Sequence, residues 1–318
     1  MEIWSSLAAV RDRPPPPPYV TVGAFDGVHL GHRALLAELK EMARQGRGAA
    51  VVVTFADHPE RHARGACPGR LSYPAEKLER LAAAGADGVL VLEFDEDLRR
   101  MAADQFVEDV LVGVLHTRGV CVGHDHHFGH DGRGDVSLLA LLGKKHRFET
   151  RAAAPCAVDG MIVSSTLIRR KLREGDVSAA NRYLGYRYEL RGEVVAGRGV
   201  GGPELGYPTA NVALEAKMLP APGVYAAFIY LPNGDGRPAE GPFGAFLNLG
   251  FRPTFGENLA EPALEVHLFD FQNHIVGRKI VVQFAARLRD ERKFADAAEL
   301  AKQLHADEEH ARRLLYRH

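Results

Sequence analysis

In its first half the chain alternates short apolar runs with longer segments whose apolar residues recur at helical spacing. The apolar runs, which predict buried strands, are 19–22, 49–55, 89–92 and 119–122, and the predicted helices are 31–44, 75–84, 102–111 and 166–184. Strands that alternate with helices in this way are typical of a parallel sheet covered by helices on both faces. This half of the sequence therefore predicts an α/β fold.

The sequence changes character after Tyr188, where short strands are separated by glycine and proline. The strands predicted here are 191–195, 223–230, 244–249, 263–269 and 279–284. Such a pattern predicts an antiparallel β-barrel, and the helical spacing of apolar residues between Asp296 and Leu315 predicts a terminal helix. A chain of 318 residues is long enough for two domains, which we place at 1–186 and 187–318.

Charge and cysteine usage restrict the class of partner. The chain has 40 Lys and Arg against 41 Asp and Glu, so no overall field attracts nucleic acid or an anionic membrane, and small molecules are the expected partners. Cys67, Cys121 and Cys156 are too widely spaced for a disulfide framework or a zinc site. No apolar run reaches the roughly 18 residues of a spanning helix. We expect a cytoplasmic protein, and the sequence leaves a homo-oligomer open.

A histidine motif stands where the first strand meets the first helix, in the segment G-A-F-D-G-V-H-L-G-H at 23–32. A helix N-terminus attracts anions, and His29 and His32 lie three positions apart on its first turn. Gly31 between them lets a phosphate approach the backbone. The segment predicts a triphosphate site, whereas the plainer alternative is a pair of surface histidines that cap a helix.

A second helix start, S-S-T-L-I-R at 164–169, carries hydroxyls and a cation. Ser165 and Thr166 can satisfy free N–H groups, and Arg169 can bind phosphate through two parallel hydrogen bonds. Alone, the segment also fits an ordinary helix cap with a solvated arginine. Beside the histidine motif it favours a site for departing pyrophosphate.

A third motif lies in the β half, where five glycines fall within residues 192–202 and L-G-Y-P-T-A-N follows at 205–211. Glycine density frees backbone N–H groups to face phosphate, although a plain surface loop is the default interpretation. Thr209 and Asn211 lie two apart, so in extended chain they point to the same side and can offer oxygen ligands to Mg²⁺.

Together these motifs resemble the bifunctional riboflavin kinase/FAD synthetase family over essentially the whole chain. Further segments carry the resemblance: T-F-A-D-H-P at 54–59, V-G-H-D-H-H-F-G at 122–129, N-L-G-F-R-P-T-F at 248–255 and E-V-H-L-F-D-F at 265–271. The resemblance implies a Rossmann-like nucleotidylyltransferase domain followed by a riboflavin kinase barrel. It further implies that ATP and Mg²⁺ are used to convert riboflavin into FMN, and that a second ATP converts FMN into FAD and pyrophosphate.

The resemblance also assigns roles to residues. It implies that His29, His32, Arg169 and Glu265 are catalytic, with Glu265 as the general base that takes the proton of the ribityl hydroxyl. The implied ATP and phosphate contacts are Gly23, Phe25, Asp26, Gly31, Ser165, Thr166, Gly197, Gly201, Pro208, Thr209 and Asn211, with Mg²⁺ at Thr209 and Asn211. The implied flavin contacts are Asp125, Phe128, Arg252 and Arg289.

Three positions depart from the family pattern. His126 stands where an aromatic residue is more usual, Gly202 where an arginine is common, and Val276 where tyrosine often precedes glycine. These departures leave open a flavin-binding or regulatory homologue that lacks one or both activities. Two further alternatives are a nucleotidylyltransferase for another phosphorylated substrate and a local metal site at His124, Asp125, His127 and His130.

Overall fold

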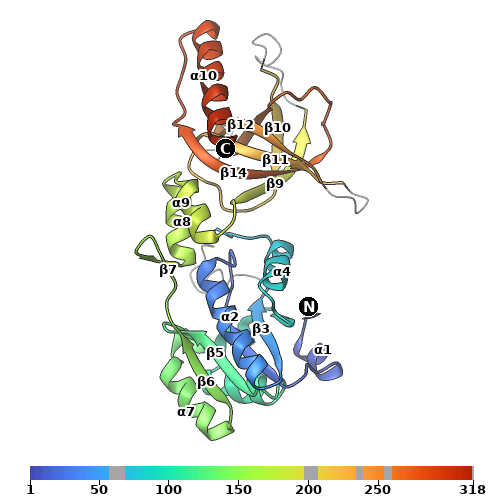
Figure 1. Ribbon diagram of the computed structural model, residues 1–318. Coiled ribbons are helices and arrows are strands. Elements are labelled where there is room, and N and C mark those ends of the chain that lie inside the picture. Colours follow the sequence, from blue (N-terminus) through green and yellow to red (C-terminus); the bar gives the residue numbers. More distant parts are fainter. Residues whose placement is uncertain (57–68, 197–206, 234–238, 254–259, 317–318) are drawn as a thin grey trace. The chain divides into compact units, whose positions relative to one another are not determined.

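The computed structural model describes residues 1–56, 69–196, 207–233, 239–253 and 260–316 of the chain (Figure 1). These residues form two compact units, Met1–Ser165 and Thr166–His318. Each unit has its own sheet and its own core, and each is described by itself below.

The first unit is built on a six-stranded sheet whose neighbouring strands all run parallel. Its strands are β1 (Glu2–Trp4), β2 (Pro18–Val22), β3 (Ala49–Phe55), β4 (Gly88–Leu92), β5 (Gly119–Gly123) and β6 (Glu149–Ala153), in the order β1-β4-β3-β2-β5-β6. From β2 the chain adds β3 and β4 on one side of the sheet, and it then returns to place β5 and β6 on the other side of β2. The direction of strand addition therefore reverses between the neighbouring strands β2 and β5. In open parallel sheets this is the position at which ligands bind.

Both faces of the sheet are buried, as the continuous apolar runs predict. In β3, Val51 and Val53 belong to one core, while Ala50 and Val52 belong to the other. Successive strand residues point to opposite faces, so an uninterrupted apolar strand fills both cores. The predicted α/β class is therefore confirmed for this unit.

Helices supply the outer layers of both cores (Figure 1). They are α1 (Leu7–Asp12), α2 (Leu30–Gln45), α4 (Pro74–Ala83), α5 (Glu96–Arg100), α6 (Ala103–Phe106) and α7 (Val136–His146). The helix predicted over 102–111 begins as α6 and continues as a π-helical segment, Val107–Val112. A short 3₁₀ turn, His130–Gly132, and a hairpin of β7 (Ala157–Val158) and β8 (Met161–Ile162) complete the unit.

The second unit is a closed barrel in which every strand pair is antiparallel. Its strands are β9 (Glu189–Val195), β10 (Ala210–Leu214), β11 (Gly223–Leu231), β12 (Glu240–Pro253), β13 (Ala260–Leu268) and β14 (Lys279–Arg289), in the order β10-β13-β12-β11-β14-β9. The predicted barrel is confirmed. Its interior is filled by alternate residues such as Tyr225, Leu247, Val266 and Phe284, all fully buried.

One segment of the outer barrel surface is covered by the terminal helix α10 (Ala297–Leu315), which begins at the N-cap Asp296. Val224, Ala226 and Phe246 on the strands form a small core with Ala311 of the helix. The terminal helix predicted between residues 296 and 315 is thus present, and it creates a second apolar layer outside the barrel.

The compact units divide the chain earlier than the boundary we predicted near residue 186. Helices α8 (Ser165–Arg173) and α9 (Val177–Leu184) fall almost wholly in the second unit, because α9 is bonded to the barrel. Asn181 donates to the carbonyl of Phe284 at 2.8 Å, and Ser178 donates to that of Ala285 at 3.2 Å. The helical segment predicted over 166–184 is helical but is divided into two helices, because Gly175 adopts a positive φ of 77° and Asp176 caps a new helix.

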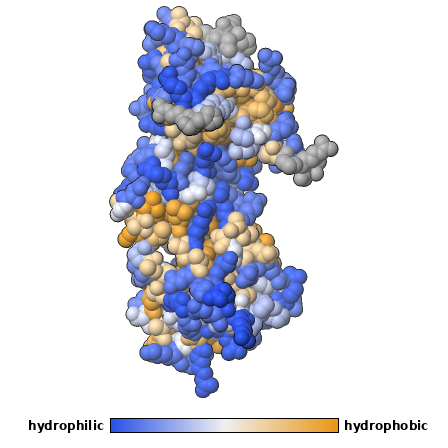
Figure 2. All heavy atoms as spheres, in the orientation of Figure 1, coloured by the Kyte–Doolittle hydropathy of each residue, from blue (hydrophilic) through white to orange (hydrophobic). Residues whose placement is uncertain are grey.

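The face drawn in Figure 2 is predominantly hydrophilic, with smaller apolar patches. Large apolar side chains that lie exposed include Leu141, Met161 and Ile162. Among the described residues, no helix is long and apolar enough to cross a membrane.

Candidate active sites

The loop from β2 to α2 takes a tightly wound path through the histidine motif. Phe25, Gly27 and Val28 all have positive φ, at 50°, 84° and 38°. The Phe25 and Val28 side chains are buried, so core packing holds a backbone shape that such residues rarely adopt. The amide of Gly23 is bonded to the carbonyl of Val53 at 3.0 Å, which continues the sheet into the loop. This loop delivers His29 to the first turn of α2.

His29 is the N-cap of α2, and its ring nitrogen Nδ1 accepts a hydrogen bond from the amide of His32 at 3.3 Å. An accepting Nδ1 carries no proton, so the neutral ring bears its proton on Nε2. The two imidazoles stack with ring centroids 3.6 Å apart. A Cβ atom at Gly31 would lie 3.1 Å from the His29 ring and 3.1 Å from the carbonyl of Val163, so only glycine fits there without displacement.

His32 is held in its neutral form. Burial is the main cause that lowers the pKa of His32 well below its usual value of 6.5; repulsion from the His29 ring whenever that ring is protonated, and from the Lys77 ammonium, acts in the same direction. Its ring lies 5.0 Å from that of Phe25, and its Nδ1 atom is buried without a hydrogen-bond partner among the residues described. A neutral imidazole can act on a phosphate oxygen as a hydrogen-bond donor but adds no full positive charge.

Asp26, in the same loop, is buried and its carboxylate binds backbone rather than facing open solvent. It accepts hydrogen bonds from the amides of Leu71 and Ser72 at 2.9 and 3.1 Å. The Ser72 hydroxyl in turn accepts from the amide of Gly27 at 3.0 Å. The Ser165 hydroxyl donates to the backbone carbonyl of Asp26 at 3.0 Å. The start of the 164–169 motif is therefore in contact with the histidine-motif loop.

A hollow lies beside this loop, lined by Ala24, Asp26, Ala56, Arg70, Ser72, Pro74 and Lys77. His29 and His32 are not among its lining residues. The ammonium of Lys77 donates to the carbonyls of Phe55 and Ala24, at 2.7 and 3.4 Å, and to the Thr54 hydroxyl at 3.2 Å. Lys77 therefore ties together the carboxyl ends of β2 and β3, a contact that the motifs did not reveal.

Thr166 and Arg169 follow on α8 and belong to the second compact unit, where Arg169 is buried. Asp125 and Phe128, the residues implied to shape the flavin pocket, lie after β5. The Asp125 side chain is exposed, whereas the Phe128 ring stacks with that of His126 at 5.7 Å and packs near Phe106.

His126 occupies the place of the more usual aromatic residue and behaves in part like one. Burial, and to a smaller extent the neighbouring His127, lowers the pKa of His126 to about 4, which keeps the ring neutral at physiological pH. The rest of the histidine-rich run offers no metal centre, because the described residues, which include all of 123–130, hold no group of three or more ligands able to bind an ion.

The barrel carries a second set of candidate site residues in one cross-strand row, four of them polar and one, Val224, apolar. Asn211 of β10 pairs with Glu265 of β13, which pairs with Asn248 of β12 on its other side. Asn248 pairs with Val224 of β11, and Val224 pairs with Arg289 of β14. Cross-strand partners point to the same face of a sheet, so the row lies on the outer face of the barrel, which α10 covers at β11 and β12.

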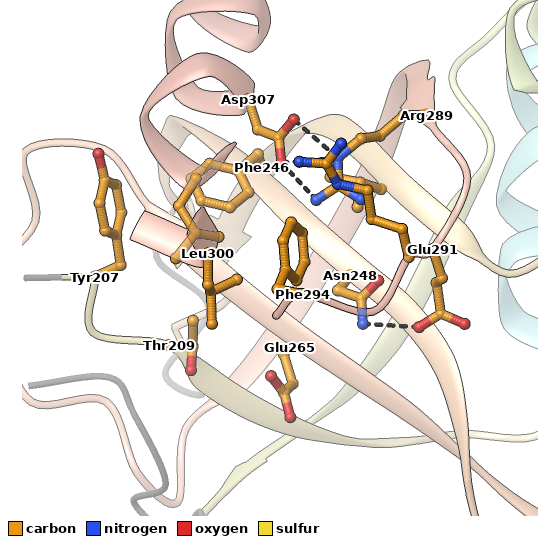
Figure 3. Close-up of a pocket in the computed structure, with 13 residues that line it drawn as sticks. Tyr207, Thr209, Phe246, Asn248, Glu265, Arg289, Glu291, Phe294, Leu300 and Asp307 are labelled. Atoms are coloured by element: carbon orange, nitrogen blue, oxygen red, sulfur yellow. Dashed lines mark hydrogen bonds and ion pairs between the residues drawn. The ribbon is translucent and has the colours of Figure 1, made fainter. Parts of the chain in front are cut away.

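All members of this row except Asn211 line a hollow of about 740 Å³, counted out to open solvent (Figure 3). The residues that line it are Tyr207, Thr209, Val224, Phe246, Asn248, Glu265, Arg289, Glu291, Arg292, Phe294, Leu300, Leu304 and Asp307. Thr209 and Glu265, which the sequence places 56 positions apart, therefore face one cavity. Apolar and aromatic side chains line much of it, with polar groups at a few points, as in many small-molecule sites.

Arg289, implied to contact flavin, forms an ion pair within the protein. Its guanidinium binds the buried carboxylate of Asp307 on α10 through contacts of 2.7 and 3.0 Å, and Gln303 donates to the same carboxylate at 2.7 Å. Figure 3 shows this pair at one wall of the pocket, and a second bond, from Asn248 to Glu291 at 3.0 Å, at another. Neither Asp307 nor Glu291 was apparent from the motifs.

Several implied contacts lie outside the described residues. Gly197 and Gly201, together with the departure Gly202, fall in 197–206. Arg252 is described only as a backbone position of β12. Val276 is described, and its side chain is 46% exposed.

Comparison with known proteins defines the class of each unit. Residues 12–167 match the family described as FAD synthetase, and residues 184–315 match the family described as riboflavin kinase. The chain is thus a flavin nucleotide-forming transferase with one catalytic activity in each of two regions.

Relatives that match over most of the chain give the particular family. Proteins named bifunctional riboflavin kinase/FMN adenylyltransferase from Escherichia coli K12 and Pseudomonas fluorescens are 37% and 38% identical to it, covering 92% of this chain and 91% and 92% of theirs. The relative of that name from Haemophilus influenzae is 34% identical, with 92% of both chains covered. The chain belongs to the bifunctional riboflavin kinase/FMN adenylyltransferase family.

A solved structure shares the full fold. It is described as a macrolide-efflux protein from Streptococcus pneumoniae, and it matches with a TM-score of 0.85 and 29% identity, covering 98% of this chain and 99% of the other. The family fixes the reactions of the present chain: it phosphorylates riboflavin with ATP to give FMN, then transfers AMP from ATP to FMN to give FAD and pyrophosphate.

Proposed function

We propose that the two reactions are carried out by the two sites described above, the kinase reaction in the barrel pocket and adenylyl transfer at the β2–α2 loop. The observation that carries the kinase assignment is the meeting of Thr209 and Glu265 in one pocket, with Asn211 and Glu265 in register on adjacent strands. An alcohol and a nucleotide bound there would meet a carboxylate and a set of neutral oxygen donors.

In the kinase site, Glu265 is the general base for the ribityl hydroxyl, which becomes acidic as its bond to phosphorus forms. Thr209 and Asn211 are suited to hold Mg²⁺, because a hydroxyl and an amide oxygen on one face of an extended segment are the hard ligands that this ion prefers. When bound, the ion neutralises charge on the ATP phosphates. Pro208 fixes the backbone just before these ligands, and Arg289 acts through Asp307 by holding α10 over the flavin.

In the adenylyl-transfer site, the phosphate of FMN attacks the α-phosphorus of ATP, and the protein supplies orientation and hydrogen bonds. The Nε2 proton of the neutral His29 ring and the His32 ring are the proposed donors to phosphate oxygens. Since both imidazoles are uncharged by this account, compensation of the triphosphate charge falls to the cation that accompanies ATP and to basic residues such as Arg169. The remaining implied contacts, among them Phe25, Asp26 and Ser165, shape the loop.

Two substitutions test this division. We expect His32→Ala to lower FAD formation by about 100-fold to 1000-fold, the usual effect of losing one well-placed donor, and to leave FMN formation within about twofold. Glu265→Gln should do the reverse. The measurement is separate initial rates, with riboflavin and ATP for the kinase and with FMN and ATP for the transferase. Because each variant retains one activity, that activity reports whether the chain is folded. Equal loss of both activities in either variant would contradict the assignment.

Other features of the proposal concern the whole protein. We infer a cytosolic location, supported by the free thiols of Cys121 and Cys156 and by the use of ATP as substrate. A homo-oligomer is compatible with the sequence, and light scattering coupled to gel filtration would measure the mass. Cell fractionation would test the location.

A further inference from the structure

The strand pairing beside the proposed magnesium ligands stops one residue short of Thr209. The ladder between β10 and β13 ends at the pair Ala210–Val266. Continued by one position, the antiparallel register would set Thr209 opposite His267. At this position the strand β10 has not yet begun, so the ladder does not fix the backbone that carries Thr209.

Where the strand pairing ends, a side-chain hydrogen bond from His267 holds the backbone instead. The Nδ1 atom of His267 lies 2.9 Å from the carbonyl oxygen of Pro208, and since a carbonyl can only accept, the imidazole must donate from Nδ1. The Pro208 carbonyl belongs to the same rigid peptide plane as the amide of Thr209. A hydrogen bond to that carbonyl therefore fixes the orientation of the peptide from which the Thr209 side chain projects.

The His267 ring is itself firmly placed. It is 8% exposed and lies edge-on to Tyr207, with ring centroids 5.1 Å apart, and at the same distance from Phe246. It projects from β13 two positions after Glu265, so both side chains leave the strand on the same face. One short segment of β13 thus carries both the proposed base and a clamp on the opposing segment.

We propose that His267 is a positioning residue of the kinase site, which holds the Pro208–Thr209 peptide so that Thr209 meets the metal-bound ATP. The inference rests on the proposed role of Thr209 and extends it to a residue that touches neither ATP nor flavin. Its effect should appear mainly in the use of Mg·ATP, because the clamp acts on the nucleotide side of the pocket and leaves Glu265 in its strand.

Two amide replacements separate positioning from packing. Asn places its amide nitrogen at the same number of bonds from the backbone as His Nδ1, whereas Gln places it one bond further away. His267→Asn and His267→Gln both remove the ring from its aromatic neighbours, so the pair differs chiefly in the ability to donate to the Pro208 carbonyl. The measurements are KM and kcat of the full-length protein for Mg·ATP and for riboflavin, with the FMN-to-FAD rate as an internal control of folding.

We expect His267→Gln to raise the KM for Mg·ATP about tenfold, the order of effect of one lost hydrogen bond, with the KM for riboflavin changed less than about twofold. His267→Asn should recover most of that loss. Equal impairment of the two variants, or an equal rise of both KM values, would show that the ring acts by packing and would overturn the inference.

Thr209→Ala, assayed in parallel, separates this inference from the function on which it rests. If Thr209→Ala leaves the Mg·ATP dependence of the kinase unchanged, the proposed site is wrong and the positioning role fails with it. If Thr209→Ala impairs the use of Mg·ATP while His267→Gln does not, the site stands and only the role of His267 is overturned.

Discussion

At the scale of single residues, the two proposed sites have one feature in common: a polar side chain forms a hydrogen bond with a backbone group next to the proposed site residues. His29 accepts from the amide of His32, Asp26 accepts from Leu71 and Ser72, and His267 binds the carbonyl of Pro208. Each of these contacts fixes a loop that ordinary strand or helix bonding leaves loose. Preorganised loops of this kind cost no rearrangement when charge develops in a transition state.

His126 gives a test of the pH dependence of stability. Its pKa in the folded chain is about 4, below the 6.5 of an unfolded histidine, so the unfolded chain binds protons more readily at mildly acidic pH. The stabilising contribution of the neutral ring is therefore complete above pH 6.5 and is lost as the pH falls toward 4. Between pH 7 and pH 5 we expect this residue to remove about 1 to 2 kcal/mol from the free energy of unfolding, measured by urea denaturation.

His126→Phe should abolish this part of the loss, since the stacked ring remains but cannot be protonated. His124→Phe, at an exposed position of the same segment, is the control and should keep the wild-type dependence on pH. A His126→Phe protein that loses as much stability as the wild type between pH 7 and pH 5 would show that His126 does not couple protonation to folding.

At the scale of elements, α10 forms one wall of the proposed kinase pocket, and a buried charge pair joins it to the barrel beside the apolar core described above. Asp307 lies on the helix and Arg289 at the end of β14, with side chains 4% and 20% exposed. A pair in such a position adds little net stability when intact, but removing one partner leaves an uncompensated charge. This wall of the pocket and the stability of the barrel are therefore coupled through this contact.

Asp307→Asn should lower the free energy of unfolding by about 2 to 3 kcal/mol and weaken riboflavin binding, because Arg289 keeps its charge and loses its counterion. The matched control on the same helix is Glu309→Gln, whose ion pairs are exposed and should contribute less than about 0.5 kcal/mol. Chemical denaturation and the KM for riboflavin are the measurements. Similar small effects of both substitutions would contradict a structural role for the buried pair.

Elements with a strong apolar pattern could be predicted from the sequence, and edge elements could not. The run 49–55 was predicted to be a strand and is β3, because it lies in the middle of a sheet and is apolar on both faces. β6, Glu149–Ala153, and β1, Glu2–Trp4, are edge strands with one neighbour each and partly exposed residues. They lack the continuous apolar run by which a central parallel strand is recognised.

The site residues follow a similar division. The resemblance to the family implied that Thr209 and Glu265 share a site, and both line one pocket of the structure. The resemblance implied that Asp26 contacts phosphate, and the structure adds that its carboxylate accepts hydrogen bonds from Leu71 and Ser72, some 45 positions away, which no local pattern reveals. Asp307, Glu291 and Lys77 were missed for the same reason, since their partners lie on other elements and no short motif contains both ends of the contact.

At the scale of the whole molecule, the segment between the two matched families belongs structurally with the barrel. The family matches end at 167 and begin again at 184, while α9 is bonded to β14 through Ser178 and Asn181. Asn181 also accepts from the amide of Tyr188 at 2.7 Å. A barrel without α9 would lose these donors and acceptors.

We therefore expect a fragment of residues 166–318 to be more stable than one of residues 187–318 and to retain more riboflavin kinase activity. Thermal unfolding and the rate of FMN formation would measure the difference. Asn181→Ala in the longer fragment should reproduce part of it, since that substitution removes two of the contacts and leaves the rest of the helix in place. Equal stability and activity of the two fragments would favour a boundary near residue 186.

The positions of the outward-facing residues Asn211, Glu265 and Asn248 depend on the correct register of the strands that carry them. In β13, Val266 is buried between two outward polar positions, so sliding this strand by one residue against its neighbours would bury a carboxylate and expose a valine. A barrel in which β13 is shifted in register is therefore less stable than the correctly paired barrel. A barrel that closes with its apolar residues inside therefore also turns Glu265, the proposed base, toward the pocket beside α10.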